Sequence, residues 1–154
     1  MRLAWTFGAL LFLSLASCNW GVLPSTDYPD ITLGEQFRVD IDQTVKLAST
    51  GYYLSFRDVP YDSRCPEGVA CIWAGFAHVD MNLWTARGDS SQIRFQIWGT
   101  TCFQHQGVSI DTLGFILTLY QLEPCRYMPD TVWSRSDYAA TMRITRSNAE
   151  APQQ

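Results

Sequence analysis

Apolar and polar residues alternate along most of this chain, and the alternation restricts the fold more than any other feature. Successive side chains of a β-strand point to opposite faces of a sheet, so a period of two indicates a strand with one buried face. The apolar residues of seven short stretches follow this period: Phe37, Val39 and Ile41; Val45 and Leu47; Tyr52, Leu54 and Phe56; Val79, Met81 and Leu83; Ile93, Phe95 and Ile97; Phe115, Leu117 and Leu119; Ala140, Met142 and Ile144.

Turn-forming residues separate these stretches, for example Ser49-Thr50-Gly51, Pro66-Glu67-Gly68 and Arg87-Gly88-Asp89. No window of ordinary helix length has a helical period. Short strands spaced regularly by turns are typical of antiparallel all-β proteins. The sequence therefore predicts an all-β fold, an antiparallel β-sandwich or barrel-like structure of about seven short strands.

The N-terminus has the organisation of a secretory signal peptide. A single positive charge at Arg2 precedes an uncharged, mostly apolar run and then small residues. The apolar run is shorter than the roughly 20 residues that cross a bilayer as a helix. We assign residues 1–17 to a signal peptide.

Leu15-Ala16-Ser17-Cys18 resembles the lipobox of bacterial lipoproteins. The resemblance implies cleavage before Cys18, lipid attachment to its sulfur and usually an acyl chain on its new amino group. Two or three chains anchor a protein durably in a membrane, whereas one is marginal. Asn19 in place of Asp after the lipid-bearing cysteine implies the outer membrane of a Gram-negative envelope, facing the periplasm. The alternative is ordinary cleavage after Ala16, which leaves Cys18 as a free or disulfide-bonded thiol.

The mature chain is acidic, with ten Lys and Arg against fifteen Asp and Glu once Arg2 is removed. Its only lysine is Lys46. Nucleic-acid binding needs basic surface to neutralise phosphates, so we expect no nucleic-acid partner. We assign residues 18–34 to a lipid-anchored linker rich in Pro, Ser, Thr and Asp, residues 35–146 to one β-sandwich domain and residues 147–154 to a disordered tail.

Four cysteines remain beyond Cys18, namely Cys65, Cys71, Cys102 and Cys125. An even number in an exported chain predicts disulfides. Four cysteines allow three connectivities; we favour the pairing of nearest neighbours, Cys65 with Cys71 and Cys102 with Cys125.

The segment Asp62-Ser63-Arg64-Cys65-Pro66, followed by Cys71-Ile72-Trp73-Ala74-Gly75, resembles a motif of an uncharacterised family of bacterial exported and lipid-anchored β-proteins. Leu117-Thr118-Leu119 and Asp137-Tyr138 with the strand that follows are similar as well, so the resemblance spans most of the mature chain. Cys125 departs from the pattern, in which an aromatic residue is expected. The resemblance implies a fold and an envelope location, and it implies no activity.

The Cys65/Cys71 pair predicts a covalent staple of the loop between two strands. A redox pair is normally Cys-x-x-Cys at a helix N-terminus, and a zinc site needs two further ligands that His78 and His105 do not supply at a metal-like spacing. We therefore expect no metal and no cofactor. Arg64 and Trp73 are candidate binding residues, because both types are enriched at interface hot spots. In the alternative that we favour, Trp73 packs on the disulfide, and Asp62 caps the turn or pairs with Arg64.

No nucleophile elbow, zinc-protease motif or phosphate-binding loop is present. We expect no enzyme, but a lipid-anchored envelope protein that works by binding or scaffolding. Its partners would be the membrane, through the lipid, and an envelope protein or a glycan that stacks on the many aromatic side chains. The alternative is an envelope enzyme or enzyme inhibitor acting on cell-wall sugars or peptides.

Overall fold

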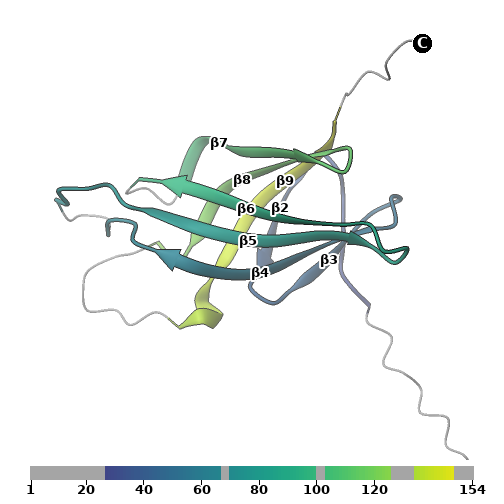
Figure 1. Ribbon diagram of the computed structural model, residues 1–154, viewed down its shortest axis with the longest axis horizontal. Coiled ribbons are helices and arrows are strands. Elements are labelled where there is room, and N and C mark those ends of the chain that lie inside the picture. The colour runs from purple at the N-terminus through teal and green to yellow at the C-terminus, as the bar shows by residue number, and fades with distance from the viewer. Residues whose placement is uncertain (1–26, 67–69, 100–102, 126–133, 148–154) are drawn as a thin grey trace, which may run out of the picture.

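The computed structural model describes residues 27–66, 70–99, 103–125 and 134–147, and they form two packed β-sheets (Figure 1). The strands are β1 (Asp30–Ile31), β2 (Gln36–Asp40), β3 (Thr44–Leu47), β4 (Tyr52–Asp62), β5 (Phe76–Thr85), β6 (Ser90–Trp98), β7 (Phe103–Thr112), β8 (Phe115–Glu123) and β9 (Ala139–Arg146), with a short 3-10 helix η1 (Arg135–Asp137) before β9.

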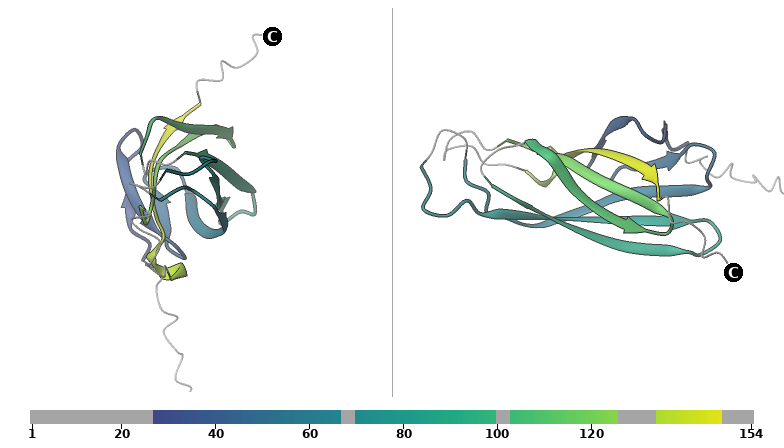
Figure 2. Two further views of the ribbon diagram at one scale, coloured as in Figure 1. Left: turned by 90° about the vertical axis from the view of Figure 1, so that its left-hand side faces the viewer. Right: turned by 90° about the horizontal axis from the view of Figure 1, so that it is seen from above.

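One sheet has the strand order β1-β3-β4-β5-β6 and the other has the order β2-β9-β8-β7. Every pairing is antiparallel except that of β1 with β3, which is parallel. Figure 2 shows the two sheets as the layers of a sandwich. The predicted all-β class and antiparallel sandwich are confirmed.

The structure has two strands more than the seven stretches that the alternation marks. β1 lies in the segment that we assigned to the linker, where Ile31 pairs with Leu47 and is buried. β7 covers a region in which the alternation marks no strand. An irregularity in the β7–β8 register, between Phe103 and Val108, interrupts the period of two and hides this strand from a pattern search.

The core lies between the sheets and is built from the inward-facing residue of each alternating pair. In β5, for example, Val79, Met81 and Leu83 are almost fully buried, whereas the residues between them are half-buried on the outer face. The largest fully buried side chains come from both sheets: Phe56, Phe95, Leu47, Leu54, Met81, Leu83, Ile97, Leu117, Leu119, Leu122, Met142 and Ile144. Burial of this apolar surface is the main stabilising contribution to the sandwich.

Arg135 in η1 connects the segment before β9 to the first sheet. Its guanidinium donates hydrogen bonds to both carboxylate oxygens of Asp42, to Oδ1 of Asp58 at 3.2 Å and to the carbonyl oxygen of Arg57 at 2.7 Å. The hydrogen bond from Arg135 holds the pKa of Asp42 below its ordinary value. All three charged side chains are solvent-exposed, so solvent screens the interaction.

We predict that Arg135→Gln lowers stability in a pH-dependent way. A carboxylate whose pKa is lowered by folding stabilises the native state above its unfolded pKa of about 4, and this stabilisation is lost as the pH falls through the folded pKa. The difference in urea midpoint between wild type and Arg135→Gln should therefore be largest near neutral pH and shrink in strong acid. Arg87→Gln, which removes an equal charge from the exposed β5–β6 turn, is the control. An equal difference in urea midpoint at neutral pH and in strong acid would contradict the stabilising role of the Arg135–Asp42 interaction.

Candidate functional site

The loop between β4 and β5 is closed by a disulfide between Cys65 and Cys71, whose Cα atoms are 6.1 Å apart. This pair confirms the predicted staple. Cys125 is also disulfide-bonded, while Cys102, its predicted partner, lies outside the described residues. Backbone hydrogen bonds from Ser63 N to Phe76 O at 2.8 Å and from Cys65 N to Ala74 O at 3.1 Å hold the two arms of the stapled loop together.

Gly75 lets these two arms approach each other. It has a positive φ of 67°, and a Cβ added there would lie 1.9 Å from the carbonyl oxygen of Ser63. No side chain fits at that distance, so glycine is required both by the backbone conformation and by the contact. The loop therefore depends on Gly75 as well as on the disulfide.

Arg64 is buried and joins the two sheets. Its guanidinium donates to both oxygens of Asp62, at 3.0 and 2.8 Å, and to the backbone carbonyls of Leu122 at 2.7 Å and Pro124 at 3.2 Å in and after β8. Asp62 in turn accepts a hydrogen bond from the Tyr138 hydroxyl, just before β9, at 3.1 Å. The side chains of Arg64 and Asp62 are each only 5% exposed.

Of the two roles considered for Arg64, the structure supports the pairing with Asp62. Asp62 Oδ1 also accepts from the Arg64 backbone N–H at 3.1 Å, which is the turn cap that we considered. The guanidinium lies between the sheets, so it offers no contact surface to a partner. Arg64 holds the loop in place and is not part of the exposed site.

Trp73 does not pack on the disulfide, contrary to the interpretation that we favoured. Trp73 is 82% exposed, and its neighbour Ile72 is 94% exposed. Backbone hydrogen bonds from Cys65 N to Ala74 O and from Gly99 N to Gly75 O hold the chain directly after Trp73. Trp73 thus remains a candidate binding residue, and Ile72 joins it.

Further aromatic side chains gather at the same end of the sandwich. Trp98, at the end of β6, is 60% exposed and its ring centroid lies 5.1 Å from that of Phe76; Tyr61, near the end of β4, is 47% exposed and lies 4.8 Å from Phe76. We call Tyr61, Ile72, Trp73, Phe76 and Trp98 the aromatic tip. Exposed large apolar residues gathered in this way are typical of interaction sites.

Sequence reasoning missed most of the aromatic tip. Trp98 follows Ile97, whose side chain points into the core, so the alternation by itself places Trp98 on the outer face. Tyr61 gave no such signal, because two register shifts in the β4–β5 pairing, between Phe56 and Tyr61, break the alternation before it.

The end of β4 and the start of β5, which carry Tyr61 and Phe76 of the aromatic tip, lie at the opposite end of the sandwich from the turn between β3 and β4 (Figure 1). β1 is paired with the end of β3, beside the turn that leads into Tyr52 at the start of β4, whereas the tip follows the other end of β4. β4 has 11 residues, and a strand of 11 residues spans about 33 Å. The chain thus enters the described domain at one end and presents the aromatic tip at the other.

The two histidines do not join this site as a catalytic pair. His78 Nε2 is 3.1 Å from Gln96 Oε1, and its ring lies 5.0 Å from that of Phe76. His105 lies in β7. Among the described residues, no group of three or more His, Cys, Asp or Glu side chains is arranged to hold a metal ion.

Comparisons with protein-family models, with curated proteins and with solved structures found no match to this chain. Within residues 27–66, 70–99, 103–125 and 134–147, no helix has the length and apolar character needed to cross a membrane. Cys18 and residues 1–17, which we predicted to be a signal peptide, lie outside the described residues.

We predict that Arg64→Met destabilises the protein by about 3–5 kcal/mol, because it leaves the buried Asp62 carboxylate without its cation. Arg94→Met is the matched control: Arg94 makes a two-point contact with Asp80, at 2.6 Å for each bond, but on the exposed face. The loss of the Arg94–Asp80 contact should lower the stability far less, because solvent screens an exposed ion pair. Urea unfolding of both variants measures the difference, and similar costs would contradict the structural role of Arg64.

We predict that Gly75→Ala disrupts the stapled loop. Gly51→Ala is the control, because Gly51 also has a positive φ, of 76°, but an added Cβ there contacts nothing within 4 Å. In the control, backbone strain alone should lower the free energy of unfolding by about 1–2 kcal/mol. Gly75→Ala should lower it clearly more. Amide exchange at Cys65 would report the opening of the loop. Equal losses in the two variants would mean that the contact with Ser63 is unimportant.

Proposed function

We propose that this protein is a non-catalytic binding domain of a bacterial cell envelope, anchored through lipid on Cys18 to the outer membrane and facing the periplasm, and that its aromatic tip contacts an envelope protein. One observation carries the proposal. Ile72 and Trp73 are 94% and 82% exposed on a loop that is closed by a disulfide and by backbone hydrogen bonds across its base. Exposing apolar side chains of this size to water has no benefit for folding.

The rigidity of the loop supports a binding role. A surface that is already ordered loses less conformational entropy when it binds, so more of the contact energy appears as affinity. Tryptophan is among the residues that most often dominate the energy of an interface. Trp73 is therefore the side chain that we expect to contribute most.

The placement of the aromatic tip supports the lipid-anchored arrangement. The chain enters the described domain at the β1 end, and the tip lies at the other end (Figure 1). A tether attached before β1 would direct the tip away from the membrane surface and toward partners in the periplasm.

The alternative of an envelope enzyme has less support than a binding role. His78 is engaged by Gln96, and the nearby carboxylate of Asp80 is held by the Arg94 guanidinium. An enzyme inhibitor, the other half of the alternative, would use the same rigid exposed loop, and only the identity of the partner separates it from other binding roles.

Photo-crosslinking in intact cells tests the proposal. A photoreactive phenylalanine analogue at position 73 should trap a discrete protein partner, whereas the same residue at position 113, an exposed apolar position in the β7–β8 turn, should not. Trp73→Ser should then weaken binding to the purified partner by roughly 30-fold, within the range of an interface hot spot. Leu113→Ser should leave it unchanged.

Equal adducts at positions 73 and 113, or none at either, would overturn the assignment of the aromatic tip as the contact. A trapped hydrolase that the wild-type protein inhibits would favour the inhibitor. Release of the full-length protein from membranes by high salt would count against the lipid anchor.

A further inference from the structure

The outer face of the larger sheet has a different character from the aromatic tip. Alternate residues of β5 point outward along it, and each faces a partner on β6: Phe76 opposite Trp98, His78 opposite Gln96, Asp80 opposite Arg94, Asn82 opposite Gln92 and Trp84 opposite Ser90. The eight residue steps from Phe76 to Trp84 span about 27 Å. Aromatic rings therefore stand at both ends of a polar stretch, which is long enough for a chain of several sugar rings.

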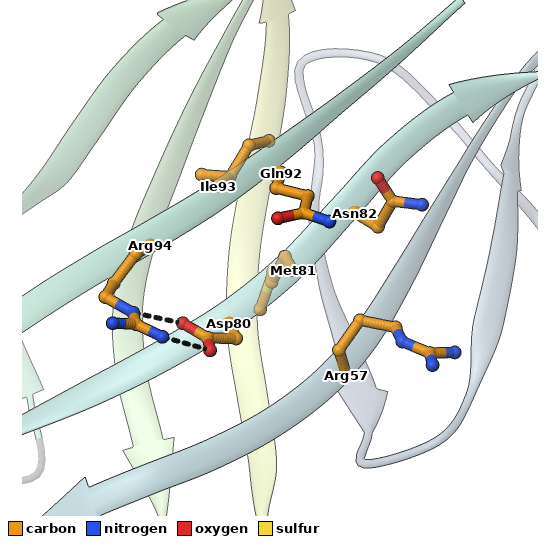
Figure 3. A pocket seen from close by; sticks show the side chains of 7 residues that line it. All are labelled: Arg57, Asp80, Met81, Asn82, Gln92, Ile93 and Arg94. Atoms are coloured by element: carbon orange, nitrogen blue, oxygen red, sulfur yellow. Dashed lines mark hydrogen bonds and ion pairs between the residues drawn. The ribbon is translucent and has the colours of Figure 1, made fainter.

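The middle of this stretch is hollowed into a groove of about 780 Å³ (Figure 3). It is lined by Arg57, Asp80, Met81, Asn82, Gln92, Ile93 and Arg94. We call it the polar groove. Its size is in the range of small-molecule sites, and it crosses three strands, β4, β5 and β6.

The charges in the polar groove do not cancel. Asp80 and Arg94 neutralise each other through the paired hydrogen bonds drawn in Figure 3. Arg57 comes from β4 and has no carboxylate within salt-bridge distance in the part of the chain that the structure describes, although its charge helps to lower the pKa of Asp42. The charged residues that line the groove, two arginines and one aspartate, therefore sum to one positive charge, although the protein as a whole is acidic.

Two amide side chains in the polar groove have hydrogen-bonding capacity that the described residues do not use. The Oδ1 atom of Asn82 is shielded from solvent and has no hydrogen-bond partner among those residues. An unpaired acceptor of this kind costs about 1–3 kcal/mol. Gln92 is exposed and faces Asn82 across the β5–β6 ladder (Figure 3). A ligand hydroxyl that reaches Asn82 Oδ1 would supply the missing donor.

Aromatic side chains border the polar groove at both of its ends. At one end Trp98 is exposed beside Phe76. At the other end Trp84 stacks on Tyr53 with centroids 4.6 Å apart, and its indole N–H donates to Ser55 Oγ at 3.1 Å. Both rings are held in place by neighbours, as a stacking platform requires.

We propose that the polar groove binds an extended glycan chain that bears carboxylates. Sugar hydroxyls would bond to Asn82 and Gln92, a carboxylate would pair with Arg57, and pyranose rings would stack near Trp84 and Trp98. An extended peptide is disfavoured, because a peptide adds to a sheet through the free backbone of an edge strand and the groove lies on the face of β5, which is paired on both sides. This site shares Phe76 and Trp98 with the aromatic tip, but Trp73 and Ile72 are not part of it, so the two proposals are tested by different variants.

Titration of the purified full-length protein with hexagalacturonic acid, followed by NMR, tests the proposal. The matched probe is the same hexasaccharide with its carboxylates methyl-esterified. We expect the acid to bind and to perturb the Asn82 and Gln92 side-chain amides, with an affinity that falls as salt is added. The ester should bind at least roughly fivefold more weakly, since charge-assisted hydrogen bonds are about twice as strong as neutral ones.

Variants assign the contacts. Arg57→Gln should bring the affinity for the acid down to that for the ester, and Arg87→Gln, which removes an equal charge outside the groove, should have no effect. Asn82→Leu should weaken both probes by roughly three- to tenfold, the value of an ordinary hydrogen bond. If Asn82→Leu lowers the melting temperature, Gln92→Leu, at an exposed position, takes its place as the test of the amide contacts.

Four results would overturn the proposal: no spectral change at roughly 10 mM acid, well above a millimolar dissociation constant; equal binding of acid and ester; equal effects of Arg57→Gln and Arg87→Gln; or no effect of the amide variants. Trp73→Ser should leave glycan binding intact. Arg57→Gln should likewise leave protein crosslinking at position 73 intact, so failure of one site is distinguishable from failure of the other.

Discussion

The buried ion pair between Arg64 and Asp62 connects the stapled loop to both sheets. It joins the end of β4 in one sheet to the carbonyls of Leu122 and Pro124 in the other, and Tyr138 adds a bond from the segment before β9. Taking two charges out of water is costly, and the full set of hydrogen bonds around both groups compensates for that cost. Because Cys65 directly follows Arg64, the same contact sets the position from which the stapled loop projects.

The loop can expose Ile72 and Trp73 because its own backbone is held from within. The disulfide, the hydrogen bonds across its base and the close approach at Gly75 restrict the loop without the help of its apolar side chains. In most loops such side chains would pack back to provide order. Here order comes from covalent and polar contacts, and the apolar surface stays available.

Much of the fold follows from the alternation of side chains. The inward residues of β5, such as Val79 and Leu83, are identifiable from period alone, and so is the outward position of Trp98. Pattern reading failed where register shifts occur. The shift in the β7–β8 ladder concealed β7, and the shifts near Asp58 concealed the outward placement of Tyr61. A bulge adds a residue to one strand, and the parity on which the pattern depends is lost from that point.

The sequence by itself determined the all-β class and most of the core, and it favoured the short-range pairing of Cys65 with Cys71, because these depend on local period and on neighbours a few residues apart. Only the tertiary structure decided that Arg64 is buried, that Trp73 is exposed and that a polar groove lies between two aromatic borders. Each of these depends on partners far away in the chain. The carbonyls that hold Arg64 lie about sixty residues away from it, and no pattern of neighbouring residues encodes a contact of that kind.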